Sequence, residues 1–139
     1  MSLTSIRNLL LIFTAAGAIT GCSQQDGPTR YDVTGVVTYA GKPVPVGFVT
    51  FIPDTDKGNK GPGGGADVKD GKYDTASGKG MVGGPHKIQV VGFDGIPVVI
   101  AGSKFEEGTP LFPRNEFEAD LPSEAGTFDI EVPVTKKKS

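Results

Sequence analysis

The stretch YDVTGVVTY, residues 31–39, decides the fold class. Val33 and Val37 occupy odd positions in it, whereas Asp32 and Thr34 occupy even ones. Alternation with a period of two, in a run of β-branched residues, predicts a half-buried β-strand. Residues 40–43 (AGKP) predict a turn, and VGFVTFI at 46–52 predicts a second strand that pairs with the first as a hairpin.

Further short strands follow along the chain. Residues 66–75 predict a hairpin that turns at Asp70-Gly71, because this pair suits a tight turn with positive φ. HKIQVVGF at 86–93 predicts a strand with Ile88 and Val90 inward, and Pro97 makes residues 96–100 an edge strand or a loop plug. Residues 103–123 look irregular, with one short strand near 117–121. The clearest strand is GTFDIEVPV at 126–134, whose predicted inward residues are Phe128, Ile130, Val132 and Val134.

The segments between these strands are rich in glycine and proline, of which the chain holds 21 and 11. DTDKGNKGPGGG at 54–65 predicts a mobile loop outside the core. No segment beyond residue 21 shows apolar residues at helical spacing over three turns. Six or seven short strands joined by turns therefore predict an all-β, antiparallel sandwich.

Seven motifs occur in a characteristic order: VTGVV (33–37), GKPVP (41–45), VTFIP (49–53), DGKY (70–73), GGPHKIQV (83–90), LFP (111–113) and GTFDI (126–130). In this order they resemble small bacterial lipoproteins with a carboxypeptidase-regulatory-like domain. The resemblance implies one immunoglobulin-like or transthyretin-like β-sandwich of about seven strands over residues 31–135. The chain departs from the family at Pro85-His86-Lys87, where members often have Gly-x-Tyr, and in a shorter segment after Pro113.

The N-terminus has the layout of a secretory signal peptide, residues 1–21. Arg7 supplies a positive charge, and the apolar run LLLIFTAAGAI follows at 9–19. Eleven residues span about 16 Å as a helix, well short of the ~30 Å hydrocarbon core of a bilayer. The sequence therefore predicts a cleaved leader helix rather than a membrane-spanning one.

The leader ends in Ile19-Thr20-Gly21-Cys22, which resembles the bacterial lipobox recognised by the lipoprotein signal peptidase. The resemblance implies acyl chains on Cys22, the only cysteine, and so a lasting anchor in membrane lipid. Ser23 stands where an aspartate often retains lipoproteins in the inner membrane, which favours the outer membrane of the cell envelope. Residues 22–30 then form a flexible tether, and residues 136–139 a charged tail.

Charge argues against nucleic acid as a partner. The chain carries a net charge of −2, and removing residues 1–21 takes away one arginine and leaves 13 basic against 16 acidic residues, or −3. Binding of nucleic acid calls for a basic patch instead.

Candidate chemistry is sparse. Asp54 and Asp56 begin like a calcium loop, but glycines stand at its later ligand positions, so they are weak metal candidates. Residues 78–83 fit GxGxxG without a following helix, which favours a flexible turn over a cofactor site. His86, the only histidine, is expected at a strand-edge surface.

Phe105, Phe112 and Phe117 are expected to cap the core beneath the long loop region, although aromatic rings on a sandwich could also stack on sugars. We expect a non-catalytic interaction or structural module of the cell envelope, with no cofactor and with an envelope protein or glycan as partner. A carbohydrate-binding module is the alternative, and a hydrolase that uses carboxylates a third hypothesis.

Overall fold

The computed structural model describes residues 27–76 and 79–134, and every described regular element except one short 3-10 turn is a strand. The predicted all-β fold is confirmed, while the leader helix predicted for residues 1–21 lies outside the described residues. No described helix is long and apolar enough to cross a membrane. The elements are β1 (Val33–Tyr39), β2 (Lys42–Pro43), β3 (Val46–Pro53), η1 (Thr55–Lys57), β4 (Gly64–Lys69), β5 (Lys72–Asp74), β6 (Gly84–Phe93), β7 (Val98–Ile100), β8 (Ser103–Phe105), β9 (Asn115–Leu121), β10 (Gly126–Thr127) and β11 (Ile130–Val132).

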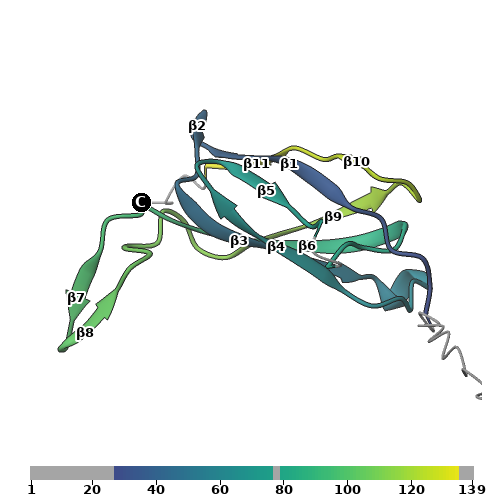
Figure 1. Cartoon of the computed structure of the whole chain (residues 1–139), viewed down its shortest axis with the longest axis horizontal. Helices are drawn as coiled ribbons and strands as arrows, with labels where there is room; N and C mark the ends of the chain where they lie inside the picture. The colour runs from purple at the N-terminus through teal and green to yellow at the C-terminus, as the bar shows by residue number, and fades with distance from the viewer. Residues whose placement is uncertain (1–26, 77–78, 135–139) are drawn as a thin grey trace, which may run out of the picture.

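Nine of these strands form one curled sheet in the order β10–β1–β5–β4–β3–β6–β9, with β2 and β11 also paired to β1. The β4–β5 hairpin carries the sheet from one layer to the other. As a result β1, β5 and β11 lie over β3, β4 and β6 in a sandwich-like half-barrel (Figure 1). The described strands pair antiparallel except β10 and β11, which run parallel to β1. β7 and β8 form a separate sheet that projects from one end (Figure 1).

The core lies inside this curl and follows the predicted alternation. Each long strand turns every second side chain inward, as the pleat requires. Ile88 and Val90 are fully buried, as predicted, and the Asp70-Gly71 turn has φ of 50° and 76°, which confirms the β4–β5 hairpin. The buried core residues are Val33, Val37, Val44, Val49, Phe51, Ala66, Val68, Tyr73, Met81, Ile88, Val90, Phe112, Leu121, Ile130 and Val132.

The hairpin predicted between residues 31–39 and 46–52 is wrong. The chain does turn tightly after β1, but only the two residues of β2 pair back onto it. Val44, fully buried, and Pro45 then accept hydrogen bonds from Gly71 and Asp70 at the tip of the β4–β5 hairpin. These contacts draw the chain across to the other layer, so β3 pairs with β4 and β6 instead.

The prediction of a mobile loop at 54–65 also needs correction. The backbone N–H of Asp54 bonds to Pro85 O at 2.9 Å, and the Asn59 side chain donates to the carbonyls of Gly83 and Pro85. Residues 55–57 form the 3-10 turn η1, and the last two glycines of the segment belong to β4. The segment is therefore held against the start of β6 by hydrogen bonds.

The strand predicted at 126–134 is interrupted in the middle. Ile130 and Val132 are buried as predicted, but Val134 is exposed, and Phe128 is half-buried at the break between β10 and β11. At the break the chain stays beside β1: Phe128 N bonds to Thr34 O, and Phe128 O accepts a hydrogen bond from the Tyr73 hydroxyl, which reaches it across Gly35. Residues 103–123, predicted as irregular with one strand, contain β8 and the expected short strand as β9.

Candidate functional site

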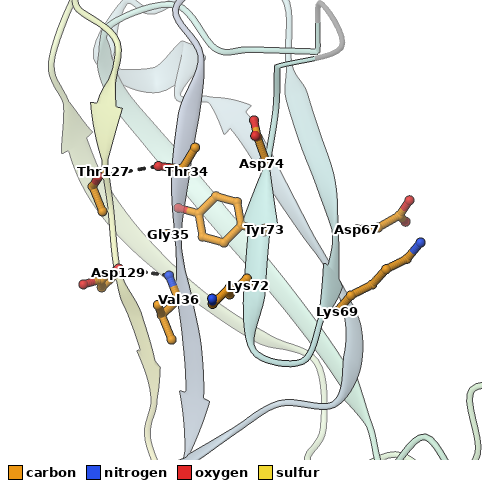
Figure 2. A pocket seen from close by; sticks show the side chains of 10 residues that line it. All are labelled: Thr34, Gly35, Val36, Asp67, Lys69, Lys72, Tyr73, Asp74, Thr127 and Asp129. Atoms are coloured by element: carbon orange, nitrogen blue, oxygen red, sulfur yellow. Dashed lines mark hydrogen bonds between the residues drawn. The ribbon is translucent and has the colours of Figure 1, made fainter.

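A shallow groove of about 610 Å³ crosses the outer face of β10, β1, β5 and β4. Figure 2 shows the side chains that line it, most of them polar, and the strand register arranges them in two rows. The first row runs through Thr127, Thr34, Asp74 and Asp67, and the second through Asp129, Val36, Lys72 and Lys69. The register explains the rows, because Thr34 pairs with both Thr127 and Asp74, and Val36 with Lys72. Three carboxylates, two ammonium groups and two hydroxyls thus share one surface.

Several of these groups already serve the local structure. Asp129 Oδ1 accepts a hydrogen bond from Val36 N at 2.9 Å, and Asp74 Oδ1 accepts one from Ala76 N at 2.7 Å. The hydroxyls of Thr34 and Thr127 lie 3.5 Å apart. The groove therefore offers hydrogen bonds to a polar ligand, and it holds neither a histidine nor a cysteine to act as a nucleophile or base.

Tyr73 forms the floor of the groove. Its ring lies against Gly35, as Figure 2 shows, and its hydroxyl donates to Phe128 O. Burial raises the pKa of the Tyr73 phenol well above its usual value, and the nearby Asp129 carboxylate raises it further. The hydroxyl is therefore a structural donor that remains protonated, and it is not available as a base.

The weak metal candidates lie in an ion-pair network instead. Lys87 Nζ is 3.1 Å from Asp56 Oδ2 and 3.7 Å from the buried Asp54 Oδ1, and Lys57 Nζ is 2.5 Å from Glu118 Oε2. The hydrogen bond to Asp56, with the Asp54 charge, raises the pKa of Lys87. Among residues 27–76 and 79–134, no three His, Cys, Asp or Glu side chains are grouped to hold a metal ion. The network joins η1 to β6 and β9 across the edge of the sheet.

The prediction of a surface histidine is wrong. His86 is only 1% exposed, because it follows the inward alternation of Ile88 and Val90 on β6. Its Nδ1 lies 2.8 Å from Gly84 O, while Nε2 has no hydrogen-bond partner in the structure. A buried ring without a carboxylate or hydroxyl partner does not form a triad.

The described part of the GxGxxG segment, residues 79–83, packs against the body. Met81 is fully buried and exchanges two backbone hydrogen bonds with Tyr31, at 2.9 and 3.1 Å. Gly80 lies against Tyr31 O and Gly83 against Ser123, where a side chain would collide. Gly78 lies outside the described residues. The glycines allow close packing, and β6 rather than a helix follows them.

The three phenylalanines divide between core and surface. Phe112 is buried with its ring 4.9 Å from that of Tyr39, and Phe117 packs partly against the core, both as predicted. Phe105 is exposed on β8, so its prediction is wrong. It lies outside the core because residues 96–105 form the projecting hairpin and not a loop plug.

This β7–β8 hairpin is the most unusual surface of the described chain. Ile96 and Val99 are each 66% exposed, and Ile100 is 56% exposed. Soluble proteins rarely expose such contiguous apolar surface unless it contacts a partner or a membrane. The sequence analysis missed the hairpin, although the signal is present: VVI and SKF flank Ala101-Gly102, which form its turn with φ of 50° and 83°.

Asp94 holds the base of the hairpin to the body. Its Oδ1 accepts hydrogen bonds from Ile96 N at 2.9 Å and Thr109 N at 3.0 Å, and so ties the two legs together. Its backbone N–H bonds to Thr109 O, and Gly95 N bonds to Glu107 O. The two backbone N–H groups hold the pKa of Asp94 below its usual value. The hairpin is therefore a preorganised projection.

Replacing Asp94 with alanine should loosen this base, since both amide donors lose their acceptor. Hydrogen exchange at Ile96 and Thr109 should accelerate severalfold, whereas Asp94→Asn, which keeps a side-chain oxygen, should change it less. Because the pKa is lowered in the folded state, the carboxylate's contribution is complete above the ordinary value of ~3.9 and is lost as the pH falls through the lowered value. Equal exchange in the wild type and Asp94→Ala would contradict this role.

The predicted lipidation site cannot be placed in this geometry. Cys22 and the recognition residues Ile19, Thr20 and Gly21 lie outside the described residues. The described chain enters the fold through Arg30, whose guanidinium donates to Gly80 O at 3.2 Å, directly before Tyr31 pairs with Met81.

The structure thus brings together two surfaces that the sequence analysis did not single out, the polar groove and the apolar hairpin. Most groove residues lie in the VTGVV, DGKY and GTFDI motifs, but those motifs do not show that the residues share one surface. No protein-family model matches this chain, and a search of curated proteins finds none that matches it.

Proposed function

We propose that the chain is a membrane-anchored lipoprotein whose β-sandwich serves as a non-catalytic interaction module of the cell envelope, of the carboxypeptidase-regulatory-like type. The observation that carries the interaction role is the β7–β8 hairpin. Its exposed apolar side chains, Ile96, Val99 and Ile100, cover no part of the core. A surface that costs solubility without stabilising the fold is best explained by a contact made outside the molecule.

The anchoring role rests on the sequence around Cys22. A positive n-region, an 11-residue apolar run and a lipobox-like end precede the only cysteine of the chain. One acyl chain gives a marginal anchor, whereas several make a lasting one. Ser23 in the next position favours the outer membrane as the destination.

Fatty-acid labelling in cells tests the anchor. A clickable palmitate analogue should label the wild type, whereas Cys22→Ser should lose all of the label. Ser23→Ala keeps the cysteine and serves as the matched control, with labelling retained. An unlabelled wild type, or label that persists in Cys22→Ser, would refute the proposal.

Carbohydrate binding is the second candidate, and the groove of Figure 2 is the observation in its favour. Its rows of carboxylates and hydroxyls suit the hydrogen-bonding groups of a sugar. Its only aromatic ring belongs to Tyr73, however, which is buried and cannot stack on a sugar face. A glycan array would show saturable binding that Asp74→Ala abolishes, and an array without hits would remove this candidate.

A further inference from the structure

The tip of the β7–β8 hairpin carries no charge. Residues 96–103 read IPVVIAGS, with the nearest charged side chain at Lys104. Ile96, Val99 and Ile100 are more than half exposed. An uncharged apolar tip that projects from the body is suited to an apolar surrounding.

Apolar side chains lie on both faces of this tip. Val98 pairs with Phe105 and Val99 with Lys104, and successive side chains on a strand alternate between faces. Val98, Ile100 and Phe105 therefore share one face, and Val99 shares the other with Lys104. Docking on a flat protein surface would cover only one face, whereas entry into lipid surrounds both, and the long stem of Lys104 lets its ammonium group reach the headgroups.

The acidic residues of the hairpin lie away from the tip. Asp94 lies beside Ile96 at the base of the hairpin and precedes Ile100 by six residues, which is about 20 Å along an extended strand. Glu106 follows the tip residue Ser103 by three residues, and its carboxylate pairs with Lys104 Nζ at 2.7 Å, so the two charges nearest the tip offset each other. The tip can therefore enter the outer ~5–10 Å of a bilayer, the depth typical of interfacial segments, while these carboxylates remain at or above the headgroups.

The anchor and the hairpin can reach the same membrane. Only residues 23–26 separate Cys22 from the first described residue, Gly27, and a chain of that length extends by at most about 18 Å. Figure 1 shows the start of the described chain and the hairpin tip at opposite ends of the molecule, both along the lower side of the view. One plane can therefore contact both ends.

We propose that the β7–β8 tip inserts into the lipid surface that holds Cys22, so that the domain lies lengthwise on the membrane with two points of attachment. This inference rests on the proposed lipid anchor. The anchor keeps the tip at a high effective concentration near the bilayer, so the tip needs only weak intrinsic affinity. Rigidity at the hairpin base, through Asp94, keeps the tip extended toward the membrane.

Single tryptophans test the insertion, because the chain has none of its own. The acylated full-length lipoprotein, carrying Ile100→Trp or Val99→Trp, is reconstituted into phosphatidylcholine vesicles with and without brominated chains. Both positions are exposed, so the fold should tolerate the ring. Lys72→Trp, exposed on β5 in the body, is the matched control. Both tip variants should emit at shorter wavelength and be quenched by bromine, whereas Lys72→Trp should show neither change.

The possible failures are distinguishable. If the protein does not float with the vesicles, the anchor itself is refuted, and the two-point attachment with it. If it floats but the tip variants are quenched no more than Lys72→Trp, the anchor stands and the insertion is overturned. A shift to shorter wavelength at only one tip position, without quenching, would indicate contact with a protein or a second copy and would also overturn it.

Discussion

Replacing Phe51 with alanine should lower the free energy of unfolding by about 4 kcal/mol, the typical cost of truncating a buried phenylalanine. Phe51 is fully buried on β3, between β4 and β6 in the centre of the sheet. Its ring centroid lies 6.0 Å from that of Tyr73 in the opposite layer, so its loss opens a cavity between the layers. Urea unfolding followed by circular dichroism measures the change, since the chain has no tryptophan.

Phe48 provides the matched control for this variant. It lies on the same strand but points outward and is 38% exposed. Phe48→Ala removes the same atoms without opening an internal cavity, so the loss should be about 1 kcal/mol or less. Equal losses in the two variants would show that the core does not lie where the structure places it.

Gly35→Ala should destabilise the protein by about 3 kcal/mol, the upper end of the usual cost of overpacking. An ideal Cβ at Gly35 would lie 2.7 Å from Tyr73 Cε1 and 2.8 Å from Phe128 C, and closer still to Phe128 O. The neighbour is backbone, so it cannot rotate away. In the variant, either the Tyr73 ring must move away from β1, or residues 128–129 between β10 and β11 must move, which weakens the parallel pairing of these strands with β1.

Gly126→Ala is the control for Gly35→Ala. Gly126 pairs with β1 in the same parallel ladder, but nothing lies within 4 Å of an added Cβ. The change should therefore be within about 1 kcal/mol and could be stabilising, because alanine restricts the unfolded chain. The same urea titration measures both variants. A tolerated Gly35→Ala would contradict the close approach of Tyr73 and Phe128 to β1.

Local pattern was sufficient to predict the strands and their inward faces. Val33, Val37, Ile88 and Val90 alternate with polar residues, and the pleat alone determines which side they take. The Asp70-Gly71 turn was also predictable, because its chemistry favours the observed positive φ. These features depend on residues close together in the chain.

The pairing of strands was not predictable in the same way. The alternating pattern of apolar and polar residues in a strand does not identify its partner strand. The parallel pairing of β11 with β1, for example, joins residues about ninety positions apart. The predicted β1–β3 hairpin failed because Val44 and Pro45 bond to a distant turn. Such contacts leave no local signal in the sequence.

The same contrast between local pattern and distant contacts applies to the candidate site residues. His86 was predicted at the surface because its ring is polar. It occupies an inward position of its strand, however, and this alternating position determines its burial. Phe105 was assigned to the core for its apolar character, although its position in an isolated hairpin exposes it. The groove forms where outward residues of the VTGVV, DGKY and GTFDI motifs meet on one surface, which depends on strand pairing and not on the motifs themselves.

A lipid anchor at Cys22 would explain why the hairpin tip and the polar groove are both exposed. It would hold the domain close to a bilayer, where an exposed apolar tip is an advantage rather than an aggregation risk. The polar groove on β10, β1, β5 and β4 would stay available to soluble partners on the outer face of the sheet.

Intact-mass spectrometry of the protein purified from membranes tests the lipid anchor most directly. The account predicts a chain that begins at Cys22 and carries the added mass of a diacylglyceryl group and an acyl chain on that residue. A chain that retains residues 1–21, or that begins at Cys22 with an unmodified thiol, would contradict it.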